Sequence, residues 1–238
     1  MTNSVKLAAL AATLAVIAAT LSGIDSTPAP GRMWRTATPV TNAAFSNGES
    51  MRQQFPKLPI TFEENRGQTD KDVRYFAQGP HYAFFLTQNE VRLSLARASN
   101  KGIVLGLRFL GRNPSATVIG AERAPGNVNY LRGNDPADWH TDVPTYSQVV
   151  YHDLWPDVDL SLREKNGALM YEFRVRPGAR IEDIRLAYRG ADRIALDRTG
   201  GLQIETAVGT IEDSAPLSYQ EIGGGARTRR FKLHITRQ

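Results

Sequence analysis

The sequence predicts an all-β protein: an antiparallel β-sandwich-like domain after an N-terminal hydrophobic signal or anchor helix and a flexible linker. Three observations predict it. Short apolar runs separated by turn residues fill the chain after residue 58, long amphipathic helices are missing there, and an uncharged apolar stretch stands at the N-terminus. Many short strands with regular turn signals are typical of sandwiches and barrels. We divide the chain into a signal peptide or membrane anchor (1–24), a linker (25–57) and a domain (58–238).

The apolar stretch LAALAATLAVIAATLSGI runs from Leu7 to Ile24, after the basic Lys6 and before the first acidic residue, Asp25. That order is typical of a secretory signal. The stretch is longer than the usual apolar region of ~7–15 residues and shorter than the ~20 that span a bilayer. We expect an exported protein (periplasm, cell surface or secreted), with a cleaved signal preferred and an uncleaved anchor as the alternative. Membrane contact is expected through this segment only.

The linker is rich in Pro, Ser, Thr and Asn and shows no hydrophobic period, which indicates a flexible spacer. The chain has no cysteine, so disulfides, thiol chemistry and Cys-ligated metals are excluded. The formal net charge is +5, but the basic residues are scattered and lack the interleaved aromatic rings that stack bases. We therefore expect no nucleic-acid partner.

Alternating apolar and polar residues mark the clearest strands of the domain. In Glu90–Ala96 the residues Val91, Leu93 and Leu95 alternate with polar or small ones, which indicates one buried face. A Gln-Asn turn at 88–89 separates this run from His81–Thr87, so the two runs predict a hairpin. The other expected strands are 103–110, 145–151, 158–163, 169–175, 184–188, 193–196, 202–206, around 211, 217–220 and 231–235.

Three long blocks carry a family resemblance. They are LPITFEENRGQTDKDVRYFAQGPHYAFFLTQNEVRLSL (Leu58–Leu95), GNVNYLRGNDPADWHTDVPTYSQVVYHDLWPDVDLSL (Gly126–Leu162) and LMYEFRVRPGARIEDIRLAYRGADRIALDRTGGLQI (Leu169–Ile204). In this order they resemble the N-terminal β-rich domain of unknown function of bacterial β-propeller-repeat (SBBP repeat) proteins. The resemblance covers about Leu58–Ile222 and implies an extracytoplasmic domain with no established activity. Family members often continue into propeller repeats, so this chain is either a stand-alone version or a truncated one.

The most distinctive polar cluster is Asn65, Arg66 and Gln68, around Gly67. A structural turn is the simpler interpretation, because Asn and Gly suit a tight turn with positive φ, and a ligand site is the alternative. A second candidate is the aromatic-rich stretch that contains Tyr130, Trp139, Tyr146, Tyr151 and Trp155. Exposed together these rings form a sugar-stacking platform, whereas buried rings belong to the core, which is the default.

Acidic residues give the remaining candidates. Asp153, Asp157 and Asp159 supply oxygen atoms of the kind that bind calcium, but their spacing is not that of an EF-hand, and a polar turn explains them more simply. The same three aspartates, together with Glu63, Glu64 and Glu172, also invite a glycosidase interpretation, because glycoside hydrolysis usually needs two facing carboxylates. Surface solvation or hydrogen bonds within turns explain each of these residues more simply. Zinc spacings, a GxSxG elbow and a phosphate-binding glycine loop are missing from the sequence. We expect no cofactor or metal and assign no catalytic residue.

These features favour a non-enzymatic module of the cell envelope or surface that interacts with a surface polysaccharide or an envelope protein. A carbohydrate-active enzyme or glycan-binding domain is the alternative. A third hypothesis makes the domain a spacer in a larger surface protein.

Overall fold

The computed structural model describes residues 6–16, 60–79, 82–96, 102–165, 167–207, 209–222 and 225–229. The strands are β1 (Lys6–Val16), β2 (Phe62–Glu64), β3 (Val73–Gln78), β4 (Tyr82–Thr87), β5 (Glu90–Ala96), β6 (Gly102–Leu110), β7 (Thr117–Tyr130), β8 (His140–Trp155), β9 (Val158–Lys165), β10 (Ala168–Val175), β11 (Arg185–Arg189), β12 (Arg193–Leu196), β13 (Leu202–Thr206), β14 (Gly209–Asp213), β15 (Leu217–Ile222) and β16 (Gly225–Arg229). Two single turns of 3-10 helix accompany them, η1 (Pro136–Asp138) and η2 (Ile181–Asp183).

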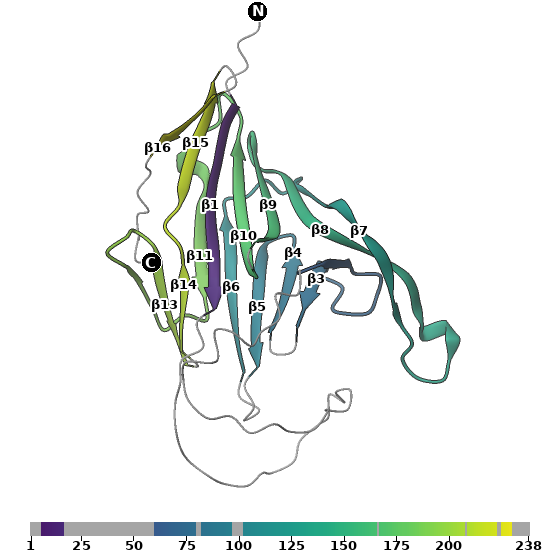
Figure 1. The fold of residues 1–238 in the computed structure, drawn as a ribbon. Coiled ribbons are helices and arrows are strands. Elements are labelled where there is room, and N and C mark those ends of the chain that lie inside the picture. Colours follow the sequence, from purple (N-terminus) through teal and green to yellow (C-terminus); the bar gives the residue numbers. More distant parts are fainter. Residues whose placement is uncertain are drawn as a thin grey trace, which may run out of the picture.

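The described strands form one 16-stranded antiparallel sheet that curls on itself (Figure 1). Its order is β11-β6-β5-β4-β3-β2-β8-β9-β10-β1-β14-β13-β12, with β7 beside β8, β15 beside β1 and β16 beside β15. The predicted all-β, sandwich-like class is therefore confirmed.

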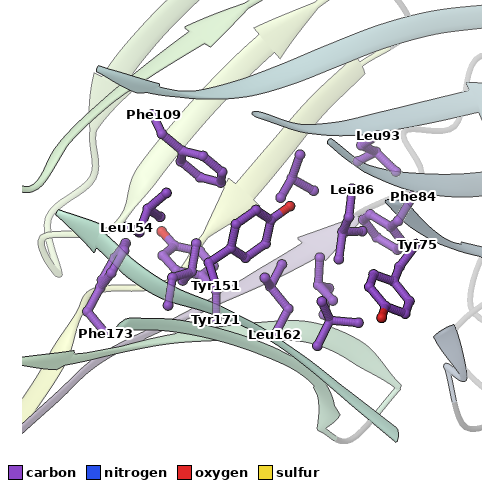
Figure 2. Close-up of a cluster of buried hydrophobic side chains, with 14 of the residues drawn as sticks. Tyr75, Phe84, Leu86, Leu93, Phe109, Tyr151, Leu154, Leu162, Tyr171 and Phe173 are labelled. Atoms are coloured by element: carbon purple, nitrogen blue, oxygen red, sulfur yellow. The ribbon is translucent and has the colours of Figure 1, made fainter. Parts of the chain in front are cut away.

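The inner face of the curled sheet holds a single hydrophobic core cluster, to which strands from both halves of the sheet order contribute. Trp155, Tyr151 and Phe173 are among its largest fully buried side chains. The ring of Phe109 meets Tyr151 and Trp155 edge-on, with centroids 5.3 and 6.1 Å apart. Figure 2 shows such side chains pointing toward one another in the space between facing parts of the curled sheet. Burial of each large apolar side chain contributes about 1.5–3 kcal/mol, so this core stabilises a domain without disulfides.

The sequence pattern predicts the strands whose residues alternate. Residues Glu90–Ala96 form β5 with the expected bounds, and β4 precedes it across the Gln88-Asn89 turn. Leu169, Tyr171 and Phe173 of β10 face the core in the same way. The strand expected at 231–235 and the linker at 25–57 lie outside the described residues.

Strands β2, β3, β7 and β16 are not predicted from the sequence, and β8 is longer than predicted. The alternation of strand β3 breaks at Phe76, which is buried on the face opposite the core, between the exposed Arg74 and Gln78. Strand β7 contains Gly120, Pro125 and Gly126, and its register with β8 shifts twice. Turn-forming residues of this kind hide a strand from pattern analysis.

The N-terminal apolar segment contributes β1 to the sheet. Lys6–Val16 pairs with β10 on one side and with β14 and β15 on the other. Of the residues that the structure describes, none belong to a helix long and apolar enough to cross a membrane. The signal or anchor role of residues 1–24 is not decided by this pairing and stays a prediction.

Strands β7 and β8 form a long hairpin, called the arm below, whose far end projects from the sheet (Figure 1). The connection at its tip contains η1, and Leu131 and Trp139 are exposed there. Strand β8 of the arm pairs with β9 and also with β2. Residues near the arm tip therefore lie close to β2, the first strand of the domain in the sequence.

Candidate functional site

Residues Asn65–Gln68 form the turn that joins β2 to β3, as the sequence predicts. The φ angle of Gly67 is +115°, in the left-handed region that glycine adopts without strain. The Asn65 side-chain oxygen accepts hydrogen bonds from the backbone N–H groups of Gly67 (3.1 Å) and Thr69 (3.3 Å), and its amide donates to the carbonyl of Asp70 (2.8 Å). Hydrogen bonds from the side chain of Asn65 to backbone groups therefore stabilise the turn.

Arg66 and Gln68 complete this turn. The Gln68 amide donates a 2.8 Å hydrogen bond to the Glu64 carbonyl, and its oxygen accepts from the Arg66 N–H. The Arg66 guanidinium pairs with the Glu64 carboxylate at 3.2 Å in an exposed position, where such pairs contribute about 0–1 kcal/mol. These contacts give both side chains structural roles, and a ligand role for them stays a prediction.

The arm packs against the turn. A Cβ atom at Gly67 would lie 2.9 Å from the His140 imidazole, so glycine is needed for this close approach. Arg132 of the arm tip donates a long hydrogen bond, 3.5 Å, to the Gln68 carbonyl. The turn and the arm, which belong to different sequence blocks, thus form one surface.

Glu63 and Tyr130 meet where the arm crosses β2 and β3. The Tyr130 hydroxyl donates a hydrogen bond to the Glu63 carboxylate, which is only 8% exposed, and Gln78 donates to the Tyr130 oxygen at 3.3 Å. Burial raises the pKa of Glu63 above its ordinary value, and the hydrogen bond from Tyr130 opposes that rise. Burial, and then the neighbouring Glu63, raise the pKa of Tyr130.

A row of directly paired residues continues from this contact across the outer face of the sheet, away from the core. Directly paired residues of adjacent antiparallel strands share a face. The rings of Phe76 and Phe85 stack with centroids 6.5 Å apart, and Phe76 also contacts Tyr130 at 6.4 Å. The row consists of Glu63, Phe76, Phe85, Arg92, Gly106 and Arg189.

An open groove of about 600 Å³ lies along the far part of this row. Its volume is within the ~300–1,000 Å³ typical of small-molecule sites. The turn after β2 supplies one wall, and strands β3 to β6 with β11 supply the rest. The lining residues are Thr69, Asp70, Val73, Phe85, Arg92, Ser94, Val104 and Arg189.

A buried carboxylate holds the two arginines of the groove. Glu90, 6% exposed, accepts a 2.5 Å contact from Arg92 Nε and a 3.2 Å contact from Arg189 Nη2 on the same oxygen. Gly106 lies between the two arginines in the row, and a Cβ atom there would lie 3.0 Å from Glu90 Oε2. The missing side chain leaves the space that this Arg–Glu–Arg bridge occupies.

The interior offers much less room. A cavity of about 30 Å³ inside the core is lined mainly by aliphatic side chains and by Tyr171 and Tyr188. That volume holds about one water molecule. Beside it the buried Asp213 accepts hydrogen bonds from Tyr171 (2.6 Å) and Tyr188 (2.9 Å), and burial raises its pKa. Of these two cavities, the outer groove is the one with room for a ligand.

The structure does not bring the predicted aromatic residues together. Trp155 is a core residue whose indole N–H donates to the Leu110 carbonyl at 2.9 Å. Tyr146 packs edge-on against Tyr75 with centroids 5.8 Å apart. Of the five predicted aromatic residues, Trp139 alone is exposed, at the arm tip. The interpretation as core thus holds for Trp155, and the rings form no common platform.

The three aspartates do converge, but on an arginine. The Arg176 guanidinium contacts Asp153 at 2.7 Å, Asp157 at 3.4 Å and Asp159 at 2.6 Å. Asp157 has a φ angle of +59° and lies in the turn between β8 and β9, whereas Asp153, with a φ angle of +50°, lies within β8 where its register with β9 shifts. Among the described residues, no group of three or more His, Asp or Glu is placed to hold a metal ion. Glu172 lies on β10 and contacts Arg163 of β9 at 3.5 Å.

Sequence reasoning misses the groove residues Glu90, Arg92 and Arg189. The first two are the polar members of the alternating strand β5, which is a signal only for an outward-facing position. Arg189 lies 99 residues after Glu90 in the chain, and its meeting with Glu90 follows from the pairing of β11 with β6.

Fold and surface together define an all-β domain, made of one curled antiparallel sheet with a groove on its outer face that two arginines help to line. Residues 62–236 match the family described as a domain of unknown function (DUF7948), and the chain belongs to that family. Neither a curated protein nor a solved structure gives a significant match to the chain.

Proposed function

We propose that this protein is exported and acts outside the cytoplasm as a non-enzymatic module that binds a surface polysaccharide of the cell envelope. The groove of about 600 Å³ carries the proposal. It combines the ring of Phe85 with the hydroxyl groups of Thr69 and Ser94 and with charged side chains. Sugars present both apolar C–H faces and hydroxyl groups, and a mixed lining of this kind suits both. An envelope protein is the alternative partner.

The ligand is tested with a glycan array and two matched variants of the full chain. Val104→Phe fills the groove at a position that is 51% exposed, so the fold tolerates the larger side chain. Leu196→Phe changes an equally apolar residue of β12, 44% exposed and not part of the groove lining. We expect binding to a polysaccharide that Val104→Phe abolishes and Leu196→Phe retains. Absence of glycan binding, or equal binding by both variants, contradicts the proposal.

Export is supported by the order of charge, apolar residues and polar linker at the N-terminus. If Lys6–Val16 acts as a signal or anchor, these residues cannot at the same time pair in the sheet as β1. A single molecule therefore has either the signal or anchor, or strand β1. Cell fractionation with N-terminal sequencing separates the cases. A mature N-terminus near residue 25 outside the cytoplasm supports a cleaved signal, and an intact N-terminus in the membrane supports an anchor. An intact protein found only in the cytosol contradicts export.

A carbohydrate-active enzyme is the second candidate, because Asp70 lines the groove and Glu90 adjoins it. Glycosidases use two carboxylates about 5–10 Å apart. Glu90, however, already accepts contacts from two arginines on one oxygen. We expect no release of reducing ends from any polysaccharide that the protein binds. Release that Asp70→Asn or Glu90→Gln abolishes overturns the non-enzymatic assignment.

We further propose that the domain is of the kind that heads bacterial β-propeller-repeat proteins. The three sequence blocks support this: they supply β2 to β5, most of the arm with β9, and β10 to β13. The test is a survey of the family for members with the same three blocks. We expect propeller repeats after the domain in many of them, and a family whose members never carry such repeats contradicts the relationship.

A further inference from the structure

We propose that the groove binds the carboxylate groups of an acidic polysaccharide, a polymer of uronic acids, through Arg92 and Arg189. This inference rests on the proposed function and deepens it, since it names the class of polysaccharide.

Charge is the first argument. Strands β5, β6 and β11 lie side by side and carry four arginines, Arg92, Arg108, Arg185 and Arg189, but a single acidic residue, Glu90. All four arginines alternate with core residues of their strands and therefore face outward. With Asp70 of the groove lining counted beside Glu90, four positive charges stand against two negative ones, so this part of the outer face keeps a net charge of +2. A positive cleft raises the local concentration of an anionic ligand.

The second argument is preorganisation. Glu90 engages Arg92 through Nε and Arg189 through Nη2, and both contacts fall on one carboxylate oxygen. A guanidinium carries five N–H donors in a fixed fork, so these single contacts do not exhaust either group. One negative charge is shared by two positive ones, which leaves a net positive charge for a ligand carboxylate to neutralise. Arg–carboxylate pairs are well suited to this because both groups are planar and form two parallel hydrogen bonds.

Gly106 supports the same arrangement. It lies directly between Arg92 and Arg189 across the strands, and a Cβ atom there would lie 3.0 Å from Glu90 Oε2 and 3.6 Å from Arg189 Nε. A methyl group at this position therefore presses on the Glu90 carboxylate, which has to shift by a few tenths of an ångström to make room for it. Gly106 acts as a positioning residue, because it leaves the space in which the two arginines are held.

The rest of the lining favours a sugar over a bare anion. Phe85 and Val73 offer apolar surface, and Thr69, Ser94 and Asp70 offer groups that hydrogen-bond hydroxyls. Single-stranded nucleic acid, the competing anionic polymer, is bound by several exposed aromatic rings that stack successive bases. Phe85 is the sole aromatic residue of this lining.

The test is isothermal titration calorimetry of the full chain with an oligogalacturonate, with a neutral galactose oligomer of equal length and with an oligo-dT strand. We expect the oligogalacturonate to bind best, with an affinity that falls as salt is added. Arg92→Gln and Arg189→Gln are each expected to weaken binding about tenfold or more, which is the scale of one charge-assisted hydrogen-bonded pair. Gly106→Ala is expected to weaken it several-fold through the displaced bridge.

Arg193→Gln is the matched control. Arg193 is an exposed arginine of β12 that pairs with Glu205 outside the groove, so its loss leaves binding unchanged. A thermal melt of each variant shows that the fold persists, and Arg92→Lys, which keeps the charge and loses the planar fork, is expected to bind with intermediate affinity.

The outcomes separate this inference from the proposed function. Equal affinity for the acidic and neutral oligomers overturns the inference and leaves polysaccharide binding standing. Binding to neither oligomer overturns the inference, and the glycan array then decides the proposed function separately. Tighter binding of oligo-dT, weakened by the same two arginine variants, overturns the polysaccharide class in favour of nucleic acid.

Discussion

Tyr171 of β10 donates a 2.6 Å hydrogen bond to Asp213 of β14, although β1 separates these strands in the sheet order. Tyr188, on β11 at the start of that order, donates a second hydrogen bond to the same carboxylate oxygen at 2.9 Å. One buried carboxylate therefore ties β11 to β10 and β14 and holds the curl of the sheet together.

Replacement of Asp213 by alanine removes the acceptor of both phenols. An unsatisfied buried polar group costs about 1–3 kcal/mol, so we expect Asp213→Ala to lower the free energy of unfolding by about 2–4 kcal/mol. Urea unfolding followed by tryptophan fluorescence measures the change. The control is Asp72→Ala in the exposed turn before β3, where a change within about 0.5 kcal/mol is expected. If the two variants lower the free energy of unfolding equally, the hydrogen bonds of Asp213 with Tyr171 and Tyr188 do not stabilise the fold as described.

The pH dependence of stability tests the same carboxylate. Burial raises the pKa of Asp213 in the folded state, so the folded protein binds this proton more tightly than the unfolded chain does. The stability from this group is present below the unfolded pKa of about 4 and is lost as pH rises through the folded pKa. Asp213→Asn keeps an acceptor and does not ionise, so its stability relative to wild type is expected to rise from pH 4 to pH 7. Parallel pH profiles contradict this account.

Tyr130→Phe tests the contact between the arm and Glu63. Glu63 then lacks the hydrogen bond that opposes the burial-induced rise of its pKa. We expect a loss of about 1–3 kcal/mol at pH 7 and a smaller loss near pH 4, because the hydrogen bond from Tyr130 favours the ionised carboxylate, whose fraction grows with pH. Thermal unfolding at both pH values measures it. In a Glu63→Gln background, Tyr130→Phe is expected to cost the same at both pH values. If the cost still depends on pH there, another ionisable group causes the dependence, and the account of Glu63 is wrong.

Gly120→Ala tests how the arm packs on the domain. A Cβ atom at Gly120 would lie 2.5 Å from the ring of Tyr146, which packs edge-on against Tyr75. Overpacking of this kind costs about 1–3 kcal/mol. We expect that cost in wild type and little of it in a Tyr146→Ala background, because the clash is with the ring itself. A double-mutant cycle from urea unfolding measures the coupling, and additive effects contradict the contact.

Local patterns predict part of this structure and contacts between distant residues produce the rest. Strand β5 and the Asn65–Gln68 turn follow from alternation and from turn chemistry within a few residues. In strand β3, contacts with Phe85 and Tyr130 bury Phe76 on the outer face, and this buried aromatic residue interrupts the apolar–polar alternation that predicts a strand. The groove requires β11 to pair with β6, and no local pattern reports that pairing. Asp153, Asp157 and Asp159 were recognisable as a cluster, but Arg176, which neutralises them, was not.

The central claim is that the outer groove binds an acidic polysaccharide through its two bridged arginines. The most direct measurement is an NMR titration of the ¹⁵N-labelled chain with an oligogalacturonate, in which the Nε–Hε signals of the arginine side chains are followed. The account predicts that the signals of Arg92 and Arg189 shift together while that of Arg193 stays in place. Unchanged Arg92 and Arg189 signals, or shifts confined to the Trp139 indole at the arm tip, would contradict it.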